Sequence, residues 1–108
     1  MEIENEGEVI AVAVSAFDER YGRLRLPQPR LERAMAASMS RYGQLSPLVG
    51  SRRGETYAVV DGFKRIHAAR SLGLEALSMS VLPLSERAAV AAVYGMNRGT
   101  RGLADLEE

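Results

Sequence analysis

Short apolar runs alternate along the chain with longer segments of helical periodicity, and this alternation predicts the order of the secondary structure. Residues 9–14 form a continuous apolar run, which favours a strand covered on both faces. After a loop over 20–30 that contains two prolines, apolar positions recur at helical spacing from Leu31 to Tyr42, and Gly43 can cap the helix. The first part of the chain therefore predicts a strand followed by a helix.

The middle of the chain predicts a β-hairpin and a second helix. Two stretches, 48–49 and 56–60, flank a turn over 52–55 whose glycine suits a position of positive φ. A basic segment with helical periodicity then runs over about 63–71 and is stopped by Gly73. The residues expected on the buried stripe of this helix are Phe63, Ile66 and Ala69.

The last part of the chain predicts one more strand and two further helices. Residues 77–81 alternate with period two, which indicates a strand with one exposed face. Ser85 can cap a third helix with Ala89, Val90 and Val93 on its inner stripe, and 102–108 open a fourth. The expected fold is α+β, with a small mixed sheet of about four strands packed with three to four helices.

The junction between the strand that ends at Asp61 and the following helix suits an anion. Gly62 allows the turn, and the N–H groups and positive dipole end of the first helical turn attract negative charge. Lys64 and Arg65 are mildly disfavoured at a helix N-terminus unless an anion compensates them. The pattern alone leaves two interpretations open, a phosphate site or an ordinary turn with solvated basic residues.

Composition fits one small domain and excludes several kinds of chemistry. With 108 residues, 46% of them hydrophobic, the chain can form one core but not two, and its zero formal net charge does not predict nucleic-acid binding. Because there is no cysteine and only one histidine, thiolate chemistry is excluded and a histidine metal centre is disfavoured. With no membrane-length apolar run and no basic signal peptide, the expectation is a bacterial cytoplasmic protein without membrane contact.

Three stretches of the chain carry a family resemblance: QLSPLV over 44–49, YAVVDGFKRIHAAR over 57–70 and LGL over 72–74. Together they resemble the N-terminal domain of the ParB chromosome-partition family, part of the ParB/sulfiredoxin superfamily and often labelled a ParB-like nuclease domain. The family has a phosphate-binding box, G-E-R-R-x-R-A, and a later E-N-x-x-R box followed by Leu and Glu. The residues that fit are Gly62, Lys64, Arg65 and Ala68 in the first box, and Asn97, Leu103 and Glu107 in the second.

The resemblance implies the N-terminal nucleotide-binding and partner-interaction domain of a DNA-partition or transcription-regulatory protein. Members of the family bind cytidine triphosphate (CTP) with Mg²⁺ and use slow hydrolysis to gate a dimeric clamp on DNA. By this resemblance the nucleotide-facing strand edge and triphosphate contacts would come from Gln44, Ser46, Pro47, Gly62, Phe63, Lys64, Arg65 and His67. Asn97 would lie near the phosphates or the metal.

Departures from the family boxes bear on metal binding and catalysis. Phe63 stands where the family has Glu, and Met96 stands where the second box has the acidic residue associated with magnesium. His67 and Thr100 replace arginines of the boxes. Since neither an aromatic ring nor a thioether holds Mg²⁺, we expect nucleotide binding with little metal dependence and very weak or no triphosphatase activity. No catalytic residue is assigned.

Two alternatives remain beside the nucleotide-binding module. A phosphate-transferring or nuclease-type enzyme would need at least two carboxylates, of which Asp61 is the one well-placed candidate. A ligand-free dimerisation domain would keep only the fold, and a homodimer is compatible with either module. We expect a polar lead-in over 1–8 and a domain over 9–108, truncated before the helix-turn-helix region through which the family contacts DNA.

Overall fold

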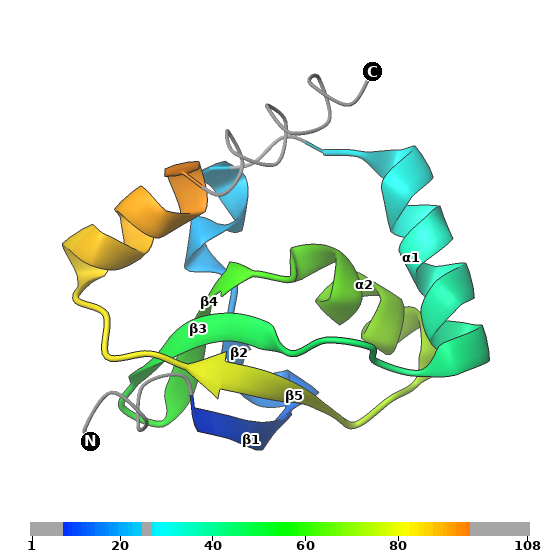
Figure 1. The fold of residues 1–108 in the computed structure, drawn as a ribbon, viewed down its shortest axis with the longest axis horizontal. Helices are drawn as coiled ribbons and strands as arrows, with labels where there is room; N and C mark the ends of the chain where they lie inside the picture. Colours follow the sequence, from blue (N-terminus) through cyan, green and yellow to red (C-terminus); the bar gives the residue numbers. More distant parts are fainter. Residues whose placement is uncertain (1–7, 25–26, 96–108) are drawn as a thin grey trace.

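The computed structural model describes residues 8–24 and 27–95, which fold into a five-stranded mixed sheet with helices packed around it (Figure 1). The strands are β1 (Glu8–Ala13), β2 (Phe17–Asp18), β3 (Leu48–Arg53), β4 (Thr56–Asp61) and β5 (Ala76–Val81). The helices are α1 (Pro29–Tyr42), α2 (Phe63–Leu72) and an unlabelled helical stretch over 86–95, with 3₁₀ turns at Val14–Ala16 and Arg20–Leu24. The expected α+β class is confirmed.

The strand order β1-β5-β3-β4-β2 places β3 at the centre of the sheet. The β5 strand runs antiparallel to β1 and parallel to β3, whereas β4 runs antiparallel to β3 and parallel to β2. Helices α1 and α2 pack together at one end of the sheet, and the stretch 86–95 lies at the other end (Figure 1). The end of β4 therefore delivers the chain directly into α2.

The local features expected around the hairpin and α2 are confirmed. Gly54 has φ +64° between β3 and β4, although the turn is shorter than expected because Arg52 and Arg53 belong to β3. On α2 the three expected residues of the stripe are buried, and Gly73 caps the helix with φ +75°. The Ser85 hydroxyl accepts a hydrogen bond from the Ala88 N–H, so the expected cap of the third helix is also present.

The N-terminal strand corrects one expectation. It was expected to be covered on both faces, but β1 lies at the edge of the sheet and alternates between exposed and buried positions. Val9 is 56% exposed while Val12 is buried, and Val14 already belongs to a 3₁₀ turn. The run looked continuous because its outward positions after Val9 are alanines, which count as apolar yet tolerate exposure.

Three further expectations were wrong in detail. The loop over 20–30 contains a 3₁₀ turn, and α1 already begins at Pro29, where proline suits the first helical turn. Leu31 and Tyr42, expected on the inner face of α1, are exposed, whereas Met39 is buried. Val90 is likewise exposed, and Ala89 and Val93 alone form the buried stripe of the third helical stretch.

Candidate functional site

The chain enters α2 through a turn that only glycine fits well. Gly62 is the N-cap of α2 and has φ +110° and ψ +18°, in the left-handed region. A Cβ atom at this position would lie 2.2 Å from Cδ2 of Leu48 and 3.3 Å from its Cα. Gly62 therefore lets β4 turn sharply into the helix while its backbone packs on the buried start of β3.

The first turn of α2 is closed by the Gly62 carbonyl. This oxygen accepts hydrogen bonds from the Arg65 N–H at 2.9 Å and from the Ile66 N–H at 3.2 Å. The Arg65 amide, one of those expected to face an anion, is thus engaged within the helix. Arg65 can instead act through its side chain, next to the positive end of the helix dipole.

The Arg65 side chain reaches the loop that precedes β3. Its Nη2 donates a hydrogen bond to Ser46 Oγ at 2.8 Å, joining two segments 19 residues apart in sequence. A guanidinium has five N–H donors, so this bond leaves most of its hydrogen-bonding capacity for a ligand. The structure thus brings together Gly62, Arg65 and Ser46, all assigned to the site from the sequence.

Gln44 holds this loop against β5. Its Nε2 donates to the Ser78 carbonyl at 2.9 Å and to the Ser46 carbonyl at 3.0 Å, and its Oε1 accepts from the Ser78 N–H at 2.7 Å. These three bonds occupy both ends of the amide. Gln44 was expected at a nucleotide-facing edge; here it positions Ser46, and through Ser46 the guanidinium of Arg65.

Replacing Gln44 with methionine should lower the free energy of unfolding by about 2 kcal/mol, because the partly buried N–H and C=O of Ser78 lose their partner. Urea denaturation followed by circular dichroism measures the change. Gln28→Met is the matched control, since Gln28 is exposed and its side chain makes no capping hydrogen bond to α1. Equal unfolding midpoints for the two variants would contradict the role given to Gln44.

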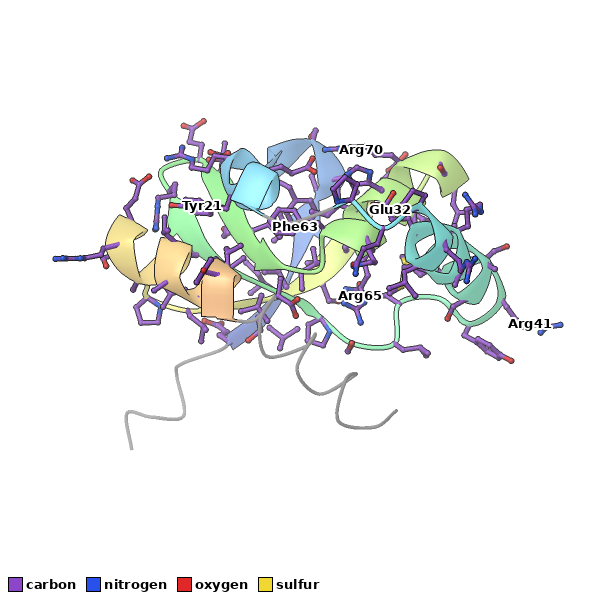
Figure 2. The ribbon with its side chains drawn as sticks, turned by 90° about the horizontal axis from the view of Figure 1, so that it is seen from above. Tyr21, Glu32, Arg41, Phe63, Arg65 and Arg70 are labelled. Carbon is purple, nitrogen blue, oxygen red and sulfur yellow. The ribbon has the colours of Figure 1, made fainter. Side chains whose placement is uncertain are left out.

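His67 lies on a different side of α2 from Arg65. Its Nε2 is 3.5 Å from Glu19 Oε1, and Nη2 of Arg70 pairs with the other oxygen of the same carboxylate. Figure 2 shows Arg65 and Arg70 on opposite sides of the helix. The structure therefore separates His67 from the Gly62–Arg65 group. Sequence reasoning did not identify Glu19 as the partner, because helical spacing pairs His67 with Arg70 but gives no sign of a distant carboxylate.

The other expected site residues fall into three groups. Phe63 is a core residue whose ring packs near Gly22, so no polar group from this position faces the turn. Lys64 and Pro47 are half-buried beside the turn and the loop. Asn97, with Met96 and Thr100, lies outside the described residues.

The described residues contain neither a cluster of metal-ligating side chains nor a helix that could span a membrane. Residues 8–24 and 27–95 bring no three metal-ligating side chains together. None of the helices in these ranges has the length and apolar character to cross a bilayer. What the described site offers to a ligand is cationic and backbone chemistry, with Asp61 as an exposed carboxylate just before the turn.

Superposition on solved structures identifies the fold type. The C-terminally truncated chromosome-partitioning protein ParB from Caulobacter crescentus, solved in complex with CTP-gamma-S, superposes with a TM-score of 0.73 at 19% identity, covering 84% of this chain and 53% of that one. Sulfiredoxin from Arabidopsis thaliana superposes with a TM-score of 0.67 at 15% identity, covering 80% and 97%. The fold is therefore the expected ParB/sulfiredoxin type.

Sequence comparisons identify the family to which the chain belongs. A probable plasmid-partitioning protein ParB from Thermus thermophilus is 43% identical over 99 residues, which cover 76% of this chain and 33% of that protein. This chain thus spans about a third of the length of that relative. The family model of the ParB N-terminal domain matches residues 2–98. Because that match covers most of the sequence, the chain belongs to the ParB N-terminal domain family.

Proposed function

We propose that this chain is the nucleotide-binding module of a ParB-like partition protein and that it holds the phosphates of a nucleoside triphosphate, CTP by preference, at the Gly62 turn. The observation that carries the proposal is the Arg65 guanidinium, fixed on Ser46 Oγ beside the N-terminus of α2. A cation at this end of a helix opposes the dipole, and a bound phosphate would offset both positive charges.

The position of Arg65 favours phosphate over a neutral ligand. A planar guanidinium can donate two parallel hydrogen bonds to phosphate oxygens, and one of its nitrogens is already fixed. Less side-chain freedom is then lost on binding, which raises affinity. The preference for CTP rests on the family resemblance and on the CTP-gamma-S bound by the Caulobacter ParB.

The proposal assigns only nucleotide binding to this chain. Because the chain spans about a third of the Thermus relative, we place DNA contact in parts of a partition protein that lie beyond this sequence. A nucleotide-dependent homodimer is the form of partner interaction that the proposal favours, with the protein acting in the cytoplasm.

Nucleotide binding should depend little on Mg²⁺, and hydrolysis should be negligible. Phe63 and Met96 stand where the family has carboxylates, and neither an aromatic ring nor a thioether holds a hard cation; Phe63 is moreover buried in the core. Thermal unfolding with CTP, ATP, GTP and UTP, each with and without Mg²⁺, tests this expectation. A nucleotide present at about 100 times its Kd should stabilise the fold by about 2.7 kcal/mol.

Variants that put a carboxylate back at the two departing positions are the control for the Mg²⁺ experiment. Met96→Glu should raise Mg²⁺-dependent CTP binding. Phe63→Glu should cost about 3 kcal/mol of stability because it removes a buried ring. Steady release of inorganic phosphate by the unmodified chain, above that of an Arg65→Ala control, would instead favour the phosphate-transferring enzyme. If none of the four nucleotides stabilises the fold, a ligand-free dimerisation domain would be favoured.

A further inference from the structure

The outer edge of the sheet at β1 is open to another strand. β1 is the first strand in the order β1-β5-β3-β4-β2, and its one partner strand among the described residues is β5. Figure 1 shows β1 at the lower margin of the fold, away from α1 and α2. Since β5 and β3 separate β1 from β4, which ends at the Gly62 turn, this edge is distinct from the proposed nucleotide site.

Alternate residues of β1 direct their backbone groups outward. The Val14 N–H donates to the Glu75 carbonyl at 2.8 Å, which extends the antiparallel register of β1 and β5 by one pair. In such a ladder every second residue bonds to the neighbouring strand, so the even-numbered residues of β1 face β5. The N–H and C=O groups of Val9 and Ala11 therefore face away from β5. The Ala13 N–H does so too, whereas its carbonyl caps the following 3₁₀ turn.

The side chains of β1 do not shield this edge. Native sheets usually protect an edge by a very short strand, a bulge, a proline or a charge. The opposite edge of this sheet is the two-residue strand β2. By contrast, β1 has six residues in unbroken register with β5, and 9–13 contain no charge, proline or glycine. Such an uncharged edge is expected to be covered by another strand.

We propose that β1 pairs antiparallel with β1 of a second copy of this chain, which joins the two sheets edge to edge. The register centred on Ala11 suits the sequence. The two Ala11 residues would exchange N–H···O bonds, and each Ala13 N–H would donate to the Val9 carbonyl of the second copy. Every residue of 9–13 then lies opposite an apolar residue, and the two Glu8 carboxylates lie at opposite ends of the pair.

A second copy matches this edge in length, polarity and register. It brings the same uncharged strand, and the small side chains of Ala11 and Ala13 leave room on the exposed face for a second backbone. A register centred on Ile10 would instead place Glu8 opposite Val12, which is buried, and so bring a carboxylate to the apolar side of the sheet. A shift in the other direction would run into the 3₁₀ turn. The strand is therefore self-complementary in one register.

Single cysteines test the pairing and its register, because the 108-residue chain has no cysteine of its own. Ala11→Cys should form a disulfide-linked dimer under mild oxidation, since opposite Cα atoms in a bonded pair lie about 5.5 Å apart, within disulfide reach. Ala13→Cys is the matched control on the same exposed face, because its two copies would lie about 14 Å apart. Ala11→Cys should cross-link at least tenfold faster. Equal rates would overturn the proposal, since they would reflect random collision.

Charges at the same position test the pairing without a covalent bond. Ala11→Lys and Ala11→Glu each place like charges opposite one another and should sediment as monomers. An equal mixture of the two should dimerise about tenfold more tightly than either variant alone. Circular dichroism checks that both variants fold, as expected at an exposed position. A mixture that stays monomeric would refute the proposal, and so would an unmodified chain that is monomeric at every concentration.

These measurements are made without nucleotide, because the edge lies away from the Gly62 turn. CTP binding by Ala11→Lys is measured separately and should equal that of the unmodified chain. A failure of the nucleotide proposal would then leave the cross-linking result unchanged. Dimerisation of the unmodified chain that Ala11→Lys does not weaken would place the interface elsewhere and overturn the pairing through β1.

Discussion

Replacing Gly62 with alanine should lower the free energy of unfolding by about 4 kcal/mol. Two costs add at this position. An L-residue at φ +110° is strained, and the new Cβ would lie 2.2 Å from Cδ2 of Leu48, which is fully buried and has little room to move. The Leu48 Cα, at 3.3 Å from the same Cβ, belongs to the central strand and limits relaxation further.

Gly73→Ala is the matched control for this substitution. Gly73 caps the other end of the same helix with φ +75°, and an added Cβ would meet no heavy atom within 4 Å. It should lose only the conformational term, about 1–2 kcal/mol. Urea titrations of both variants measure the difference. Equal losses would mean that Leu48 repacks without cost and that only the backbone conformation matters at Gly62.

This prediction also determines how the proposed nucleotide site can be probed. Gly62 sets the direction of α2 and at the same time allows Leu48 to pack beneath the turn. A binding defect in a Gly62 variant would therefore mix lost structure with lost contacts. Arg65 is half-buried at the surface and makes one described side-chain hydrogen bond, so changes there report on the ligand more directly.

The parts of the fold that the sequence predicts are those governed by local signals. Gly54 and Gly73 mark turns because both need positive φ, and the stripe of α2 is regular because one face of that helix is buried while the other faces solvent. The turn at Gly62 follows from the same kind of signal, a strand that meets a helix at a glycine. Its anchor on Ser46 lies 19 residues away and could not be deduced from spacing.

The features that sequence analysis missed depend on distant contacts. The β2 strand has two residues, Phe17 and Asp18, and exists through its parallel pairing with β4, so it leaves no periodicity to detect. The Gln44 contact with Ser78 spans 34 residues. Leu31 sits at a helical spacing that suggested a buried face, yet α1 packs mainly on α2 and leaves Leu31 in solvent. Tertiary packing, rather than the local sequence pattern, determines the β2 strand, the Gln44–Ser78 contact and the exposure of Leu31.

Nucleotide binding should depend on Arg65 far more than on His67. Arg65 reaches across the turn to Ser46, whereas His67 faces Glu19 on another side of α2. Removing a charged donor to phosphate typically costs 1.5–3 kcal/mol, so Arg65→Ala should weaken CTP binding by about tenfold to 150-fold. His67→Ala should stay within about twofold, because the geometry gives it no part in a phosphate contact.

Calorimetric titration of both variants against CTP and ATP measures these losses, with urea denaturation confirming that each variant is folded. Ser46→Ala extends the comparison, because it removes the anchor of the guanidinium but keeps its charge. Affinity should then fall severalfold, less than in Arg65→Ala, since the side chain must be ordered by the ligand itself. Equal losses for Arg65→Ala and His67→Ala would remove the support for a phosphate site at this turn. The helix would then carry its basic residues for ion pairs of the kind that Arg70 makes with Glu19.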